Sequence, residues 1–104
     1  MKASQHLIDN VDRIVHVIES GQIDDNQEGD VFDFIDDVLD IRFILNSKRE
    51  YVGAELCVAF GGPTIWVDLV NRQVKGYWWD EQWVRSYDHD NLGLEDVVSD
   101  LYHA

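Results

Sequence analysis

The chain has 104 residues, 45% of them hydrophobic, and its 21 acidic and 8 basic residues give a net charge of −13. This length fits one domain, and the apolar content is high enough to form its core despite the charge. Such a negative field repels phosphate backbones and anionic membrane surfaces, so direct binding to nucleic acids or membranes is not expected. We therefore expect a single domain over residues 1–104 that binds basic protein surfaces.

The sequence contains one cysteine, Cys57, in an apolar run where an isolated thiol behaves as a small hydrophobic residue. An intrachain disulfide is excluded. We find no export signal and no apolar stretch long enough to cross a membrane. These features predict a cytoplasmic protein.

The first forty residues predict two amphipathic helices. Apolar residues recur at three- and four-residue spacing over 3–20, with Ser4 as N-cap and Gly21 as the C-terminal stop. After a polar linker, Asp30 caps a second periodic run that predicts a helix over about 30–39. One face of this second helix is expected to gather four acids despite their mutual repulsion. They are Asp33, Asp36, Asp37 and Asp40.

From residue 41 the helical period changes to an alternating one, which is typical of strands in an antiparallel sheet. Turn-forming residues divide the region into four or five strands, and such a succession predicts a meander. The expected strands cover 41–45, 51–60, 64–70, 74–79 and, as a possible fifth, 83–87. The expected turns are Ser47-Lys48-Arg49-Glu50, Gly61-Gly62-Pro63 and Asn71-Arg72-Gln73. The strand over 51–60 is expected to place Val52, Ala54, Leu56, Val58 and Phe60 on one face.

A last helix is predicted where apolar residues from Leu94 to Tyr102 recur at helical spacing, with Asp90 or Asn91 as the cap. Strands that cluster between helices indicate helices packed on an antiparallel sheet. The predicted fold class is therefore α+β. Its architecture is an antiparallel meander of four or five strands with two N-terminal helices and one C-terminal helix packed on the sheet.

The charge is distributed unevenly along the chain. Residues 1–40 contain 11 acids and 2 bases, residues 41–79 contain 3 acids and 5 bases, and residues 80–104 contain 7 acids and 1 base. Carboxylates at short intervals on a rigid helix can present charge as a nucleic-acid backbone does. The same acidic faces can equally serve only to keep the protein soluble.

Patterns for catalysis and for metal binding are not found. Gly61-Gly62-Pro63 lacks the lysine and the glycine spacing of a phosphate loop, and the histidines lack the pairing of a zinc site. The stretch 24–29 opens like an EF-hand loop, but Ile35 occupies the last position, where calcium needs a bidentate glutamate. A calcium-responsive module is therefore a weaker alternative. We expect no enzymatic activity, no cofactor and no metal.

Two adjacent tryptophans, Trp78 and Trp79, lie in an aromatic region of the sequence. Consecutive strand residues point to opposite faces, so these two side chains cannot both lie in one core. One is expected to pack against the helices. The other either stays exposed near Arg72 and Lys75, as an anchor for a protein partner, or is buried by residues 80–91.

The segment from Glu55 to Asp68 reads ELCVAFGGPTIWVD, and VKGYWW follows at residues 74–79. Together they resemble small acidic proteins of phages and prophages, in a match that covers about residues 50–104. The common pattern is Gly-Gly-Pro, a strand with Trp between β-branched residues and then Asp, a Tyr-Trp-Trp strand and a short C-terminal helix. Some proteins of this kind are anti-CRISPR inhibitors, so the resemblance implies evasion of host defence. The chain departs from the pattern after Trp79, where Asp80-Glu81-Gln82-Trp83 replaces an expected glycine.

The leading hypothesis is an acidic, non-enzymatic inhibitor in the host cytoplasm that binds a basic nucleic-acid-binding surface of a defence protein, such as a Cas protein. In this role it would act as an anti-CRISPR-like DNA mimic. The alternative is an intracellular adaptor or immunity-type protein that binds its partner through the aromatic face of the sheet. The sequence leaves the oligomeric state open. The expected partner-binding residues are Asp24, Asp25, Glu28, Asp33, Asp36, Asp37, Asp40, Trp79, Asp80 and Glu81.

Overall fold

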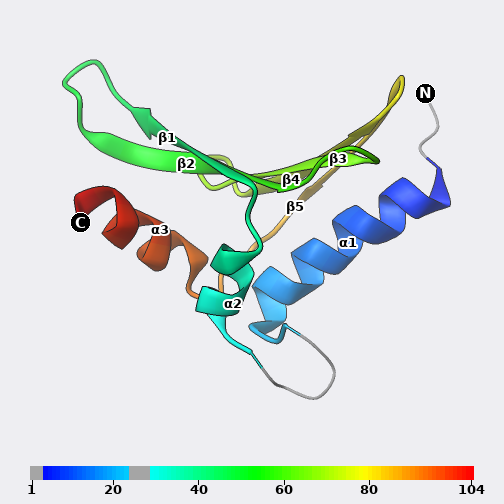
Figure 1. Ribbon diagram of the computed structural model, residues 1–104, viewed down its shortest axis with the longest axis horizontal. Coiled ribbons are helices and arrows are strands. Elements are labelled where there is room, and N and C mark those ends of the chain that lie inside the picture. Colours follow the sequence, from blue (N-terminus) through cyan, green and yellow to red (C-terminus); the bar gives the residue numbers. More distant parts are fainter. Residues whose placement is uncertain (1–3, 24–28) are drawn as a thin grey trace.

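The computed structural model describes residues 4–23 and 29–104. Within them the strands pair in chain order as one antiparallel meander, and the three helices lie on the same face of the sheet (Figure 1). The elements are α1 (Gln5–Ser20), α2 (Val31–Asp36), β1 (Asp40–Leu45), β2 (Tyr51–Ala59), β3 (Thr64–Asp68), β4 (Gln73–Trp78), β5 (Glu81–Ser86) and α3 (Leu94–His103). The predicted α+β meander is confirmed, with five strands. None of the described helices is long and apolar enough to cross a membrane.

Both predicted ends of α1 are confirmed. The Ser4 hydroxyl accepts a hydrogen bond from the Leu7 amide, and Gly21 closes the helix with a left-handed φ of 74°. The apolar stripe that periodicity predicted is the buried face of the helix. Its predicted members Leu7, Val11, Ile14, Val15 and Ile18 are buried and Ile8 is half-buried, while Val17, which was not predicted, is buried as well.

The α1 helix approaches β4 unusually closely at Gly76. A Cβ atom at that position would lie 2.5 Å from Val11 Cγ2 and 2.9 Å from Leu7 Cδ1. Either distance is too short for two carbon atoms, so only glycine allows α1 to pack directly on the strand. Buried Val74 on β4 and Ile65 on β3 complete the contact beneath the helix.

Polar contacts fix α1 to the neighbouring elements. Asp12 Oδ1 accepts from the indole Nε1 of Trp83 at 3.1 Å and pairs with Arg85 Nη1 at 3.0 Å. Near the end of the same helix, Glu19 accepts a hydrogen bond from the Asp88 amide at 2.8 Å. These two acids of α1 therefore hold the fold together.

The N-cap residue of α3 is Gly93, which has no side chain to bond the first amides, and Asp90, one of the two predicted caps, does so from three residues earlier. Its carboxylate accepts from the amides of Gly93, Leu94 and Glu95. Glu95 in turn receives two hydrogen bonds of 3.1 Å from the Arg72 guanidinium, which ties the start of α3 to the turn between β3 and β4. Arg72 is thus engaged within the protein.

The α2 helix is shorter than predicted, because it ends at Asp36 rather than near residue 39. Its beginning is as expected: Asp30 and Asp33 form a capping box. At its end the Leu39 amide donates to the Cys57 carbonyl at 2.8 Å, so pairing with β2 draws the chain into the sheet. Asp40 consequently belongs to β1, and the predicted helix face with four acids is wrong.

The single face predicted for the strand over 51–60 is also wrong in part. Ala54 and Leu56 are buried as expected. Register shifts at both ends of β2 interrupt the alternation, so Val52 is exposed. Phe60 lies beyond the end of the strand and is 77% exposed.

We predict that Gly76→Ala lowers the free energy of unfolding by about 1–3 kcal/mol, because the added methyl group collides with Leu7 and Val11. Chemical denaturation measures the change. Gly62→Ala is the matched control, since a Cβ there meets nothing within 4 Å. Equal losses in the two variants would contradict close packing of α1 on β4.

Candidate functional site

The side of the molecule formed by α2 and α3 carries acids without any lysine or arginine from these helices. The sequence has neither residue type over 14–41, and none after Arg85. The exposed carboxylates on and beside the two helices form no ion pair with any described residue. We call them the acidic surface: Asp30, Asp33, Asp36, Asp37, Asp96 and Asp100.

An apolar groove of about 410 Å³ runs between α2 and α3 within this acidic surface. Although four of the six residues of α2 are apolar, none of them is fully buried. Phe32 is 61% exposed and Leu101, on α3, is 44% exposed. The groove is lined by Phe32, Ile35, Asp36, Val97, Asp100, Leu101 and Ala104.

The expected partner-binding residues do not form one surface. Asp33, Asp36 and Asp37 lie at α2, whereas Trp79 and Asp80 form the turn between β4 and β5, far from α2 in the upper part of the view (Figure 1). Glu81 accepts a hydrogen bond from the Ser4 amide and so anchors the start of α1. Asp40 lies on the edge strand, 3.7 Å from Arg42. Asp24, Asp25 and Glu28 lie outside the described residues.

Trp79 is the most exposed large hydrophobic residue described, at 89%. It has a left-handed φ of 59°, a conformation that favours glycine or asparagine. Trp78, its neighbour, points to the helix side and packs edge-on against His6. Residues 81–86 form β5 instead of folding over Trp79, so the alternative that residues 80–91 bury it is wrong.

The face of the sheet opposite the helices, which we call the open face, carries aromatic side chains. The positive charges on it are largely engaged by partners within the protein. The Arg42 guanidinium lies 4.5 Å from the centroid of a Trp66 ring, and Lys75 pairs with Asp68 at 3.0 Å. Tyr77 is exposed on the same face. The aromatic face that the alternative hypothesis requires is therefore present, although its cations Arg42 and Lys75 already have partners within the protein.

Asp68 organises the turn that follows β3, although it is only 3% exposed. It accepts hydrogen bonds from the Val70 and Asn71 amides and from the Asn71 side chain. Burial alone would raise the pKa of Asp68, but these bonds and Lys75 outweigh it and hold the pKa below its usual range. This carboxylate is structural.

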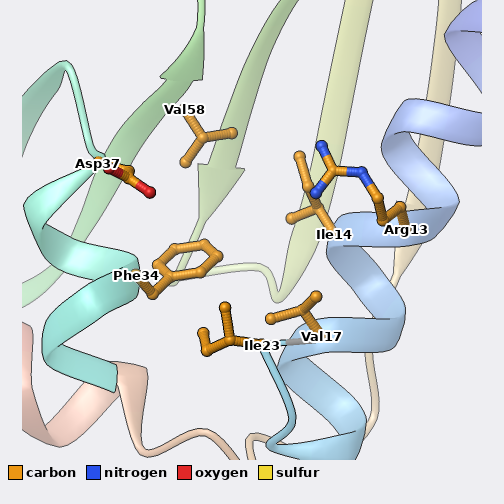
Figure 2. Close-up of a pocket in the computed structure, with 7 residues that line it drawn as sticks. All are labelled: Arg13, Ile14, Val17, Ile23, Phe34, Asp37 and Val58. Atoms are coloured by element: carbon orange, nitrogen blue, oxygen red, sulfur yellow. The ribbon is translucent and has the colours of Figure 1, made fainter. Parts of the chain in front are cut away.

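A second, smaller cavity of about 190 Å³ lies between α1, α2 and β2 (Figure 2). Its interior is apolar, and Arg13 and Asp37 flank it from opposite sides (Figure 2). This volume is below the usual range of ligand pockets. Arg13, the last basic residue before α2 in the sequence, lines this cavity.

Neither metal-binding geometry nor a known relative identifies the site. Among residues 4–23 and 29–104, no three His, Cys, Asp or Glu side chains gather closely enough to hold a metal ion. No protein-family model matches the chain, and no match was found among curated proteins or solved structures. The resemblance to phage proteins therefore stays a prediction.

The groove and the acids of α3 were not among the residues expected from the sequence. One feature of the sequence could have indicated the groove. Phe32 falls outside the periodic run of α2 that predicts burial, so a large apolar side chain is expected on the exposed side of this helix. On α3, Asp96 and Asp100 are one turn apart, as are Val97 and Leu101. Only the three-dimensional structure places these side chains opposite α2.

We predict that Trp79→Gly leaves the free energy of unfolding unchanged or raises it by up to about 1 kcal/mol. The indole packs on little and the left-handed backbone suits glycine, while the added freedom of the unfolded chain offsets part of the gain. Urea denaturation checks this. A loss above about 1 kcal/mol would mean that the side chain stabilises the hairpin after all.

We predict that Asp68→Asn lowers the free energy of unfolding by about 1–3 kcal/mol at pH 7. Because the folded-state pKa of Asp68 is depressed, its contribution is complete above the unfolded pKa of about 3.9 and is lost as pH falls through the folded value. The difference in the free energy of unfolding between wild type and variant should therefore narrow below about pH 4. Denaturation series from neutral to acidic pH measure this difference. A difference that widens on acidification would contradict the structural role of the ionised Asp68 carboxylate.

Proposed function

We propose that this protein is a non-enzymatic inhibitor that binds a basic nucleic-acid-binding surface of a host defence protein in the host cytoplasm. The observation that carries the proposal is the acidic surface itself. Two neighbouring helices present exposed carboxylates there, and neither contains a lysine or arginine. The resemblance to phage proteins favours a CRISPR effector as the defence protein.

The internal ion pairs of the protein support this proposal, because they engage four basic residues with acids outside the acidic surface. Arg42, Lys75 and Arg85 pair with Asp40, Asp68 and Asp12 on the sheet or between the sheet and α1. Arg72 is held by Glu95 at the start of α3. The field over α2 and α3 therefore stays negative and would steer the protein toward a basic channel.

Competition with nucleic acid follows from the same electrostatics. A channel that binds a phosphate backbone presents lysines and arginines at close intervals. Carboxylates fixed on two neighbouring helices can satisfy those cations without offering a scissile bond. An inhibitor of this kind needs no catalytic group, no cofactor and no metal.

One specific observation favours a second function, that of an adaptor or immunity-type protein. Trp79 combines 89% exposure with a left-handed backbone, and exposed Phe60 lies in the loop at the same end of the sheet. Large exposed aromatic residues are frequent binding hot spots. In that case the hairpin tip and the open face would make the contact.

We predict that the combined variant Asp36→Asn, Asp37→Asn, Asp96→Asn and Asp100→Asn binds purified CRISPR effector complexes about tenfold more weakly than wild type. Four lost charge contributions of about 0.35 kcal/mol each, roughly 1.4 kcal/mol together, account for this factor. Asp30 and Asp33 are retained because they cap α2. Biolayer interferometry with and without target DNA measures binding and competition.

The matched control neutralises four exposed acids away from the acidic surface and reaches the same net charge: Asp9→Asn, Glu50→Gln, Asp80→Asn and Asp88→Asn. It should bind like wild type. Equal weakening by both variants would show that only net charge matters. Loss of binding in Trp79→Gly, with full binding by the α2–α3 variant, would establish the second function instead.

A further inference from the structure

The groove between α2 and α3 has an apolar floor and an acid on each wall. Phe32 and Ile35 from α2 face Val97 and Leu101 from α3 across it. The side chains of Phe32 and Leu101 are too exposed to serve mainly as core. An acidic surface that served only for solubility would not need this apolar floor.

The charges around the groove define what can enter it. Asp36 and Asp100 line opposite walls, and Asp33 and Asp96 lie one turn before them on the same helices. An occupant therefore needs apolar groups in the middle and positive groups along both sides. Phosphate backbones and anionic membranes carry the wrong sign.

The walls of the groove also select a conformation. Both walls are helices, whose backbone amides and carbonyls are bonded within each helix except at the ends. An extended peptide would find no strand edge here to pair its own backbone groups. A helical peptide satisfies its backbone internally and needs only side-chain contacts.

We infer that the groove binds a short basic amphipathic helix of the partner, with its apolar stripe on Phe32 and Leu101 and its lysines or arginines against the aspartates. This inference rests on the proposed function of the acidic surface and specifies the chemistry of the partner. The contact is then a helix-in-groove interface with apolar anchors at i, i+3, i+4 and i+7.

The test uses a synthetic amphipathic peptide of leucine and lysine, about 18 residues or roughly five helical turns long. Its matched controls are a scrambled peptide of the same composition and a leucine–glutamate peptide of the same pattern. NMR titration of the full, isotope-labelled chain locates the contact. We expect binding of the leucine–lysine peptide with the largest shift changes in α2 and α3, and weak or no binding of both controls.

Two variants separate apolar docking from charge attraction. Phe32→Ser and Leu101→Ser each remove an exposed apolar anchor and should weaken the peptide about tenfold. Phe60→Ser, at a more exposed site outside the groove, should leave binding unchanged. Thermal melts verify that all three variants are folded.

Equal binding of the scrambled peptide, or unchanged binding by both Phe32→Ser and Leu101→Ser, would overturn the groove as a docking site. If the Asp36→Asn, Asp37→Asn, Asp96→Asn and Asp100→Asn variant still loses affinity for effectors in that case, the acidic surface keeps its proposed function without the groove. If that variant binds effectors like wild type, the proposed function fails as well.

Discussion

The close packing of α1 on β4 determines how the rest of the molecule is arranged. Gly76 lets the helix lie directly on the strand, and Asp12 fixes it to Trp83 and Arg85 of β5. This long helix therefore covers the β4 and β5 half of the sheet, while α3 packs against β2 (Figure 1). The short α2 helix does not cover a strand of its own, and none of its residues is fully buried. The apolar groove beside α3 follows from this arrangement.

Two groups among the described acidic residues differ in the contacts that they make. One group holds the fold: Asp12, Glu19, Asp68, Glu81, Asp90 and Glu95 each accept hydrogen bonds from distant backbone or side-chain groups, or cap an element. The other group is the acidic surface, where only the capping pair Asp30 and Asp33 has such a role. The proposed function therefore draws on the acidic surface, on one side of the molecule, and not on the whole net charge of −13.

The features that could be predicted from the sequence are those set by local chemistry. Ser4 and Gly21 mark the ends of α1 because capping and left-handed closure depend on neighbouring residues alone. The alternation of apolar residues and the turn sequences were likewise sufficient to predict the antiparallel meander. Asp90 could be named as a cap because it precedes an apolar helical period.

The features that could not be predicted from the sequence depend on contacts between distant segments. The end of α2 and the place of Asp40 are set by the bond from Leu39 to Cys57, which periodicity cannot reveal. The groove requires Phe32 and Leu101 to line the same space, although they lie far apart in the sequence. The exposure of Trp79 depends on the register of β4 with β5, because that pairing leaves it in the turn.

In the proposed function, complementary charge brings the acidic surface to a basic nucleic-acid-binding surface. Stopped-flow association with a captured effector, followed from about 50 mM to about 500 mM NaCl, tests this attraction because added salt screens it. We expect the association rate constant to fall by about tenfold or more over this range, with a much smaller change in the dissociation rate constant. An association rate constant that stays unchanged across the range would contradict it.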